Sequence, residues 1–220
     1  MLRRPLVVLG AALVALTLAG PALAVRVHVR VEGASATIFG PTEPRLTPKS
    51  GTIHPPDGPD VTVSGASPFG ALERASVLGE FYYEVTSTSF GPYVSQIGRY
   101  AAAGATGWVY KVNGVSPPVG AIDYHLKDGD RVLWYFARFG ASGGPKTLRI
   151  TGLFQRPGCY RAWAEDDNGR RSKATDVTFR VDRRVVWSAD GTICLNRRWH
   201  ELRAKKAGHV RSQLVVRRGS

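Results

Sequence analysis

The chain has little cysteine and few helix signals, and these shortages limit the kinds of metal site and the fold classes that it can form. Two cysteines in 220 residues exclude a protein with several zinc or iron–sulfur sites. Glycine and proline are abundant instead, with 25 and 14 residues. Frequent breaks of this kind in regular secondary structure are typical of short strands joined by turns. The sequence therefore predicts a mainly β fold and argues against a helical bundle or a coiled coil.

Catalytic and metal-binding motifs are also missing. None of the five histidines forms a ligand-spaced pair such as H-E-x-x-H, and the sequence has no nucleophile elbow, P-loop or dinucleotide-binding glycine motif. Asp123 and His125 fit either an acid–base pair or a plain surface pair. The acidic turn at 166–169 lacks the spacing of an EF-hand loop. We therefore expect a protein that is not an enzyme and that needs no metal or other resident cofactor.

One long hydrophobic run stands near the first residue. A positively charged start precedes an apolar run over 5–19, and 22–24 read A-L-A, as in a signal-peptidase site. The run is shorter than the ~20 residues of a membrane span, and no second such run follows. We expect 1–24 to be a secretory signal peptide and the mature protein to begin at Val25, exported to the cell envelope or secreted. An uncleaved anchor is the alternative.

Export would place both cysteines in an oxidising compartment, where a disulfide persists. We therefore expect Cys159 and Cys194 to be joined. A nucleophilic role for Cys159 is the alternative, but the sequence offers it no motif partner.

Positive charge is concentrated in the second part of the chain. The whole sequence carries 30 Lys+Arg against 17 Asp+Glu, a net charge of +13. Residues 25–140 hold ten of each sign, whereas 141–220 hold eighteen basic and seven acidic residues, a net charge of +11. A change this abrupt predicts two domains, 25–140 and 141–220, joined at Ala141-Ser142-Gly143-Gly144-Pro145, whose residues favour a flexible turn.

The basic charge has two interpretations. It serves solubility alone, or it attracts anionic envelope material such as membrane phospholipid, wall polymer or extracellular DNA. Export disfavours nucleic acid inside a cell as the partner, and no nucleic-acid-recognition motif is present. The anion-binding candidates are the paired residues Arg197, Arg198, Lys205 and Lys206.

Local patterns outline the first domain. Valines alternate with polar residues over 25–32, which predicts an opening strand that is half buried. Residues 40–68 hold seven of the fourteen prolines and predict a long surface loop. Ser67 begins a helix in which Phe69, Leu72 and Val77 share a face. Further strand-like segments follow. Asn113-Gly114 signals a tight hairpin turn, and Pro117 and Pro118 exclude a central strand after it, so this arm is an edge strand or a loop.

At this point the chain resembles a known family. The segments G-W-V-Y-K-V-N-G at 107–114 and D-G-D-R-V-L-W at 128–134 are similar to the C-terminal domain of transcobalamin and intrinsic factor. They resemble more closely an exported bacterial family built on that module. The resemblance covers 25–140 and implies a β-grasp-like mixed sheet curled around one helix. Many bacterial relatives carry a cysteine pair in this domain, and this sequence does not.

The resemblance also implies a ligand. In the vitamin carriers this domain covers one side of cobalamin, and a separate helical domain closes the other side. Aromatic side chains recur on neighbouring strands of the domain, where they fit either a core or an exposed surface for a flat, apolar ligand. The candidate ligand-binding residues are Phe90, Tyr93, Trp108 and Tyr110.

The second domain shows strand patterns of its own. Apolar residues alternate at 148–150 and 177–181, and P-G-C-Y-R-A-W-A at 157–164 resembles a late strand of immunoglobulin-like extracellular modules. We expect a small β-sandwich-like domain there. Taken together, the sequence predicts an exported, non-enzymatic binding or interaction protein. One alternative is a carrier of a corrinoid or another small ligand, held on the β-grasp face. Another is an unrecognised hydrolase, which would need an acid, a base and a nucleophile clustered in one cleft.

Overall fold

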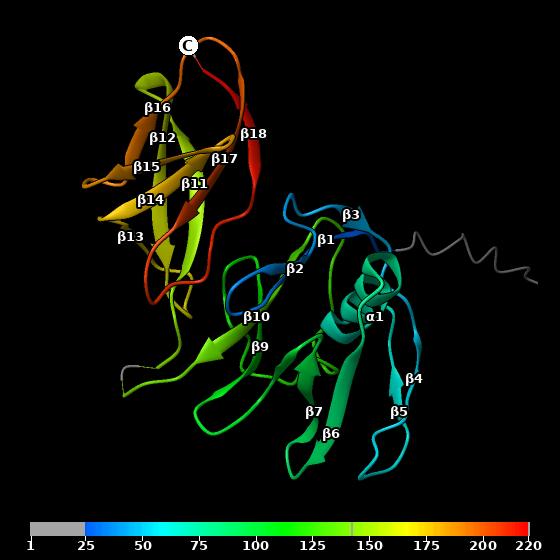
Figure 1. Cartoon of the computed structure of the whole chain (residues 1–220). Coiled ribbons are helices and arrows are strands. Elements are labelled where there is room, and N and C mark those ends of the chain that lie inside the picture. The colour runs from blue at the N-terminus through cyan, green and yellow to red at the C-terminus, as the bar shows by residue number, and fades with distance from the viewer. Residues whose placement is uncertain (1–24, 142, 220) are drawn as a thin grey trace, which may run out of the picture.

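The computed structural model describes residues 25–141 and 143–219, so the predicted signal peptide lies outside the described residues. Strands dominate the described part, and α1 (Pro68–Gly79) is its one helix (Figure 1). The prediction of a mainly β fold is confirmed. No helix within these residues is long and apolar enough to cross a membrane.

A mixed sheet packs against α1 and forms the first core. Its strands are β1 (Val27–Glu32), β2 (Thr37–Phe39), β3 (Arg45–Leu46), β9 (Thr106–Val112) and β10 (Arg131–Arg138). They lie in the spatial order β2-β1-β10-β9, with β3 paired to β1. β1 and β10 are parallel, and the other pairs are antiparallel. This β-grasp-like arrangement agrees with the fold that the family resemblance implies.

The helix begins where the sequence predicts. The Ser67 hydroxyl accepts a hydrogen bond from the Gly70 backbone N–H at 3.1 Å and so caps the first turn. Phe69 and Leu72 are buried in the core, as predicted, but Val77 is exposed and Ala75 takes the buried position. The α-helical period explains the correction: Phe69, Leu72 and Ala75 are spaced by three, whereas Val77 falls on the opposite face.

The proline-rich segment contains more structure than predicted. Besides β3, it forms the antiparallel pair β4 (Gly51–Ile53) and β5 (Val61–Val63), so the prediction of a long loop without strands is wrong. Each strand is short enough to fit between the prolines, which cannot donate to a ladder. A third sheet follows α1 and has the order β6 (Tyr83–Thr88), β7 (Gly91–Ile97) and β8 (Tyr100–Ala101).

The second part of the chain forms two facing antiparallel sheets. One contains β11 (Thr147–Leu153), β12 (Arg156–Glu165), β13 (Arg171–Lys173) and β16 (Thr192–Cys194). The other contains β14 (Val177–Val181), β15 (Arg184–Ser188), β17 (Trp199–Lys205) and β18 (Val215–Arg218), in the order β15-β14-β17-β18. Buried residues of both sheets, such as Ile150, Phe179 and Leu202, share one apolar core, which gives a sandwich-like packing.

The predicted disulfide is present. Cys159 on β12 lies directly opposite Cys194 on β16, and the two are bonded across this sheet. The segment predicted to join two domains, 141–145, lies between β10 and β11. That the two parts are separate domains stays a prediction.

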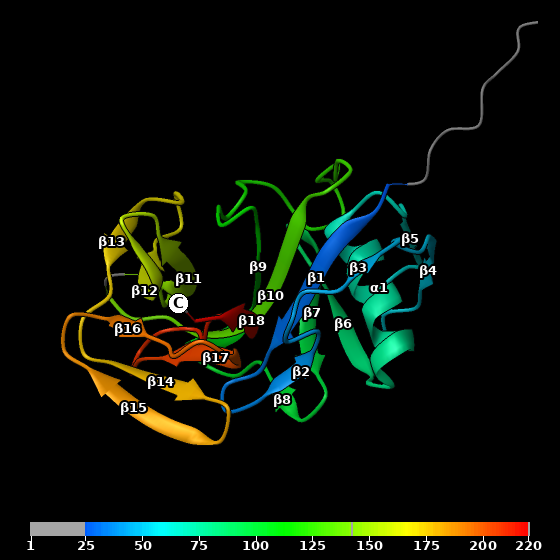
Figure 2. The ribbon, with the colours of Figure 1, turned by 90° about the horizontal axis from the view of Figure 1, so that it is seen from above.

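Both faces of β1 are covered, which corrects the expected half-buried strand. Val27, Val29 and Val31 are fully buried in the core with α1, as predicted. Arg30 and Glu32, expected in solvent, are buried as well. The reason is tertiary: β1 and β10 lie between α1 on one side and the strands β11–β18 on the other (Figure 2).

Candidate ligand-binding site

The four aromatic candidates line one cavity. Its volume is about 420 Å³, and Phe90, Tyr93, Trp108 and Tyr110 all contribute to its wall. The sequence predicts that Trp108 and Tyr110 share one strand face, and the structure brings all four residues together where β7 passes β9. Other wall residues are Pro117, Trp134, Tyr135, Phe139 and Asp167.

Close packing of β7 on β9 fixes Tyr93. Its hydroxyl accepts a hydrogen bond from the Trp108 backbone N–H at 3.0 Å. A Cβ atom at Gly107 would lie 2.2 Å from that hydroxyl oxygen, so only glycine permits this approach. The Tyr93 ring is therefore held in place by the backbone of the neighbouring strand.

Trp108 belongs to both the cavity wall and the core. Its indole N–H donates to the Tyr100 carbonyl at 2.8 Å, and its ring packs edge-to-face on Phe136 with centroids 5.4 Å apart. Because the side chain is almost fully buried, it is a rigid part of the wall.

Tyr110 and Phe90 differ in their exposure. The Tyr110 hydroxyl donates to the Val119 carbonyl at 2.7 Å, and burial, with smaller effects from Tyr124 and Asp123, raises its pKa to about 12. The phenol is therefore neutral at physiological pH. Phe90 lies in the turn between β6 and β7 and is 97% exposed, so it is the accessible residue of the rim.

One wall residue comes from the second part of the chain. Asp167 lies after β12 in the acidic turn 166–169, whose spacing does not fit an EF-hand loop. Its carboxylate is 3.2 Å from the Lys111 ammonium and 3.3 Å from the Ser116 hydroxyl. No sequence signal relates Asp167 to β9, because more than fifty residues separate them. The cavity thus combines an apolar, aromatic wall with one carboxylate at its edge.

The anion-binding candidates do not form a single site. Arg197 and Arg198 are exposed just before β17, whereas Lys205 and Lys206 stand at its other end. A strand rises about 3.3 Å per residue, so the two pairs are about 23 Å apart. The Lys206 ammonium donates to the Thr175 carbonyl at 2.6 Å, and Lys205 is exposed.

The remaining candidates show no catalytic arrangement. Asp123 and His125 are both exposed in the segment between β9 and β10. Within 25–141 and 143–219, no cluster of three or more His, Cys, Asp or Glu side chains has the geometry to hold a metal ion.

One family model matches part of the chain. A family described as a domain of unknown function, DUF4430, matches residues 73–138 and is associated with transcobalamin-like domains. The match covers less than a third of the chain and includes β7, β9 and β10, which carry half of the residues that line the cavity. No curated protein matches the sequence. Most residues of the cavity wall therefore lie in the segment of the chain that matches this family, whereas Phe69, Phe139 and Asp167 lie outside it.

Proposed function

We propose that the protein is an exported, non-enzymatic binding protein whose ligand occupies the aromatic cavity. One observation carries this proposal: four aromatic side chains from two strands and a turn meet in a single cavity of about 420 Å³. Small-molecule sites are typically apolar cavities of about 300–1,000 Å³ with a few polar groups. Export is supported by the disulfide, a bond that persists in oxidising compartments.

The wall defines the class of ligand. Aromatic faces and Pro117 favour a flat, apolar molecule, and Asp167 with the Ser116 hydroxyl offers hydrogen-bond acceptors at one edge. A corrinoid is the alternative ligand, supported by the similarity to transcobalamin-like domains. The cavity lies at the small end of the usual range, so a corrinoid would be covered on one side only and would bind weakly.

Tryptophan fluorescence tests the proposal, because Trp108 and Trp134 both line the cavity. We expect an apolar fluorescent dye, anilinonaphthalene sulfonate, to bind and to change this fluorescence. Calorimetry with cyanocobalamin tests the corrinoid alternative. Phe90→Ala should weaken dye binding at least fivefold, because it removes the exposed rim of the cavity.

Phe154→Ala is the matched control. Phe154 is 99% exposed in the turn between β11 and β12 and does not line the cavity. An equal loss of binding in both variants, or no fluorescence change with the dye, would contradict the proposed site.

A second candidate function, adhesion to an anionic phospholipid surface, is favoured by the outer face of the β15-β14-β17-β18 sheet. Trp187 on β15 is 64% exposed. Thr178 on β14 lies opposite Trp187 on one side and opposite Lys205 of β17 on the other, so the three residues form a row across the sheet. Val185 is 71% exposed and lies opposite Arg180. Tryptophan favours the headgroup region of a bilayer, and cations are attracted to anionic lipid.

A further inference from the structure

The charge of the aromatic cavity differs in sign from that of the whole chain. Among the described residues that line it, Asp167 is the one charged side chain, and no lysine, arginine or histidine contributes to the wall. The whole sequence carries a net charge of +13. A ligand in the cavity therefore meets a carboxylate, although the molecule as a whole attracts anions.

The Asp167 carboxylate has one oxygen free for a ligand. Its Oδ1 accepts a hydrogen bond from the Ser116 hydroxyl at 3.3 Å and lies 3.2 Å from the Lys111 ammonium. Its Oδ2 has no hydrogen-bond or ion-pair partner among the residues that the structure describes. The Asp167 side chain is 49% exposed, whereas Lys111 is fully buried, lies outside the wall and also donates to the Asp166 carbonyl at 2.9 Å. Lys111 therefore leaves Oδ2 accessible to a ligand.

Hydrogen bonds of the backbone fix the position of Asp167. Its carbonyl accepts a hydrogen bond from the Ser116 N–H at 2.8 Å, which ties the turn after β12 to the segment after β9. The neighbouring Asp166 carboxylate accepts hydrogen bonds from the Asn168 and Arg170 N–H groups, both at 2.9 Å, and so closes the turn. The free oxygen is thus positioned by the fold, which reduces the entropy lost on binding.

A second carboxylate stands beside the cavity. Asp123 is exposed, and a Cβ atom at the wall residue Gly120 would lie 3.0 Å from its Oδ2. Burial, and then the proximity of Tyr124 and Asp123, raises the pKa of Tyr110 to about 12, so the negative charge of Asp123 also reaches this wall residue. Two carboxylates therefore flank the aromatic wall.

The aromatic wall itself favours positive charge. The faces of aromatic rings carry partial negative charge and attract a cation within about 6 Å of the ring centre, most strongly for tryptophan. Trp108 and Trp134 both line the cavity, together with Tyr93 and Tyr110. The rings and the carboxylates thus select for the same sign of charge in a ligand.

We propose that the cavity selects a flat aromatic molecule that carries one ammonium group. This inference rests on the proposed function, because it names the class of ligand that the same cavity takes. The rings of the ligand would contact the aromatic wall, and its ammonium would donate a hydrogen bond to Oδ2 of Asp167. A neutral ligand would leave that interaction unused, and an anion would be repelled by both carboxylates. An anionic dye would bind through its rings alone, with its sulfonate in solvent.

Calorimetric titration of the mature protein with three matched probes tests the charge preference. Tryptamine is a cation at neutral pH, tryptophol is its neutral counterpart with a hydroxyl group, and indole-3-propionate is an anion with a side chain of similar length. Tryptamine should bind at least about tenfold more tightly than tryptophol, and indole-3-propionate should bind least tightly. The net charge of the protein would favour the opposite order, so the expected order reports the cavity rather than the whole surface.

Three variants locate the preference. Asp167→Asn keeps the shape of the side chain and should bring the affinity for tryptamine to within about twofold of that for tryptophol. Its affinity for tryptophol should stay unchanged, which shows that the cavity is intact. Asp123→Asn, at an exposed position, should reduce the preference for tryptamine about two- to threefold. The control Asp60→Asn removes an exposed carboxylate between β4 and β5, outside the wall, and should leave the preference unchanged.

The outcomes distinguish this inference from the proposed function. If tryptophol or indole-3-propionate binds the wild type as tightly as tryptamine, the ammonium preference is wrong and the cavity remains a binding site. If none of the three probes binds, the proposed function is contradicted as well. An unchanged preference in Asp167→Asn would show that its carboxylate does not select the ligand and would also overturn the inference.

Discussion

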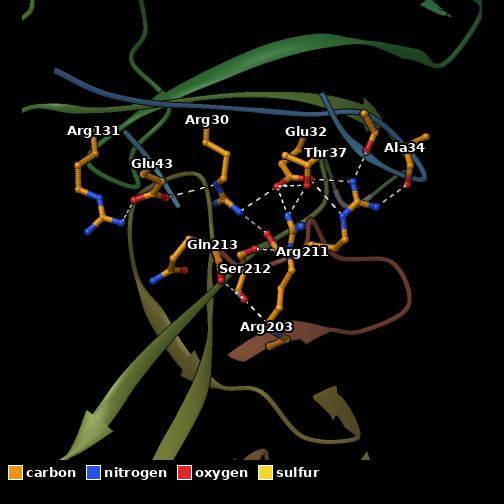
Figure 3. Close-up of polar contacts among 12 residues, drawn as sticks. Arg30, Glu32, Ala34, Thr37, Glu43, Arg131, Arg203, Arg211, Ser212 and Gln213 are labelled. Atoms are coloured by element: carbon orange, nitrogen blue, oxygen red, sulfur yellow. Dashed lines mark hydrogen bonds and ion pairs between the residues drawn. The ribbon is translucent and has the colours of Figure 1, made fainter. Parts of the chain in front are cut away.

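Arg211 donates two hydrogen bonds to one carboxylate oxygen of Glu32, at 2.7 Å from Nη2 and 3.1 Å from Nε, across a sequence separation of 179 residues. Arg203 pairs with the other oxygen of the same carboxylate. The Glu32 side chain is fully buried, and its contacts join β1 to β17 and to the segment after it (Figure 3). One carboxylate therefore connects the two parts of the molecule.

Replacing this carboxylate should be strongly destabilising. Glu32→Gln leaves Arg203 and Arg211 without their counter-charge in a buried site, which typically costs about 3–5 kcal/mol in the free energy of unfolding. Urea unfolding followed by circular dichroism measures it. Glu84→Gln, at an exposed position on β6, is the control and should change stability by less than about 0.5 kcal/mol. Similar losses in the two variants would contradict the role assigned to Glu32.

The disulfide should contribute to stability through the unfolded chain. It closes a loop with a sequence separation of 35 residues, for which the chain-entropy account predicts about 3–4 kcal/mol. The Cys159→Ser/Cys194→Ser variant should therefore unfold at a clearly lower urea concentration than the oxidised wild type. Wild type reduced under unfolding conditions and then refolded should match the variant. An unchanged urea midpoint in the variant would show that the disulfide does not contribute to the free energy of unfolding.

Stability should fall in acid partly through Asp182. Its carboxylate accepts a hydrogen bond from the Glu201 backbone N–H at 2.9 Å and another from His200 at 2.9 Å, and these hold its pKa below the ordinary value of 3.8. A carboxyl group whose pKa is depressed by folding stabilises the protein above its unfolded pKa, and this contribution is lost as pH falls through the folded pKa.

The pH dependence of urea unfolding measures this effect. Stability of the wild type should decrease as pH drops below about 4. The Asp182→Asn variant should be less stable at neutral pH and should lose less stability over the same acid range. Parallel profiles for the two proteins would contradict the assignment.

The basic charge should drive adhesion to anionic phospholipid if the second candidate function holds. Binding to vesicles of phosphatidylglycerol should fall steeply between about 0.05 and 0.3 M salt, since contacts between exposed charges are screened beyond the Debye length. Co-sedimentation measures it. The weakened variant replaces with glutamine the four residues Arg197, Arg198, Lys205 and Lys206.

A matched variant takes the same number of exposed basic residues from the neutral first part: Arg26, Lys49, Arg99 and Lys127. It removes an equal charge but should retain vesicle binding. If both variants lose binding equally, net charge alone is responsible. Binding that does not respond to salt would exclude adhesion by charge.

Local physics explains what could be predicted from the sequence. Ser67 caps the helix because the preference of serine for this position needs only the next turn of the chain. Asn113 and Gly114 both take positive φ angles, 53° and 88°, as their types favour, and so form the turn that follows β9. The cysteine pair also follows from composition, because two cysteines in an oxidising compartment have a single intramolecular pairing.

The features that could not be predicted from the sequence depend on contacts between residues far apart in the chain. The alternation in β1 predicts two faces, but it does not say whether the polar face meets water or another sheet, and here it meets the second part of the chain. The residue types of Arg30 and Glu32 do not indicate that these side chains are buried, because charged residues on a strand face usually lie in solvent. Only tertiary structure brings Arg203 and Arg211 to Glu32, and Asp167 to the aromatic cavity.

The sequence by itself thus determined the mainly β class, the helix start, the turn after β9 and the bonded cysteines, because each depends on neighbours in the chain or on composition. Tertiary structure alone decided which aromatic residues share a cavity. It also buried the ion pairs of Glu32 with Arg203 and Arg211 between the two parts of the molecule. These depend on how strands far apart in the sequence pair and pack, and period-two alternation is compatible with many such pairings.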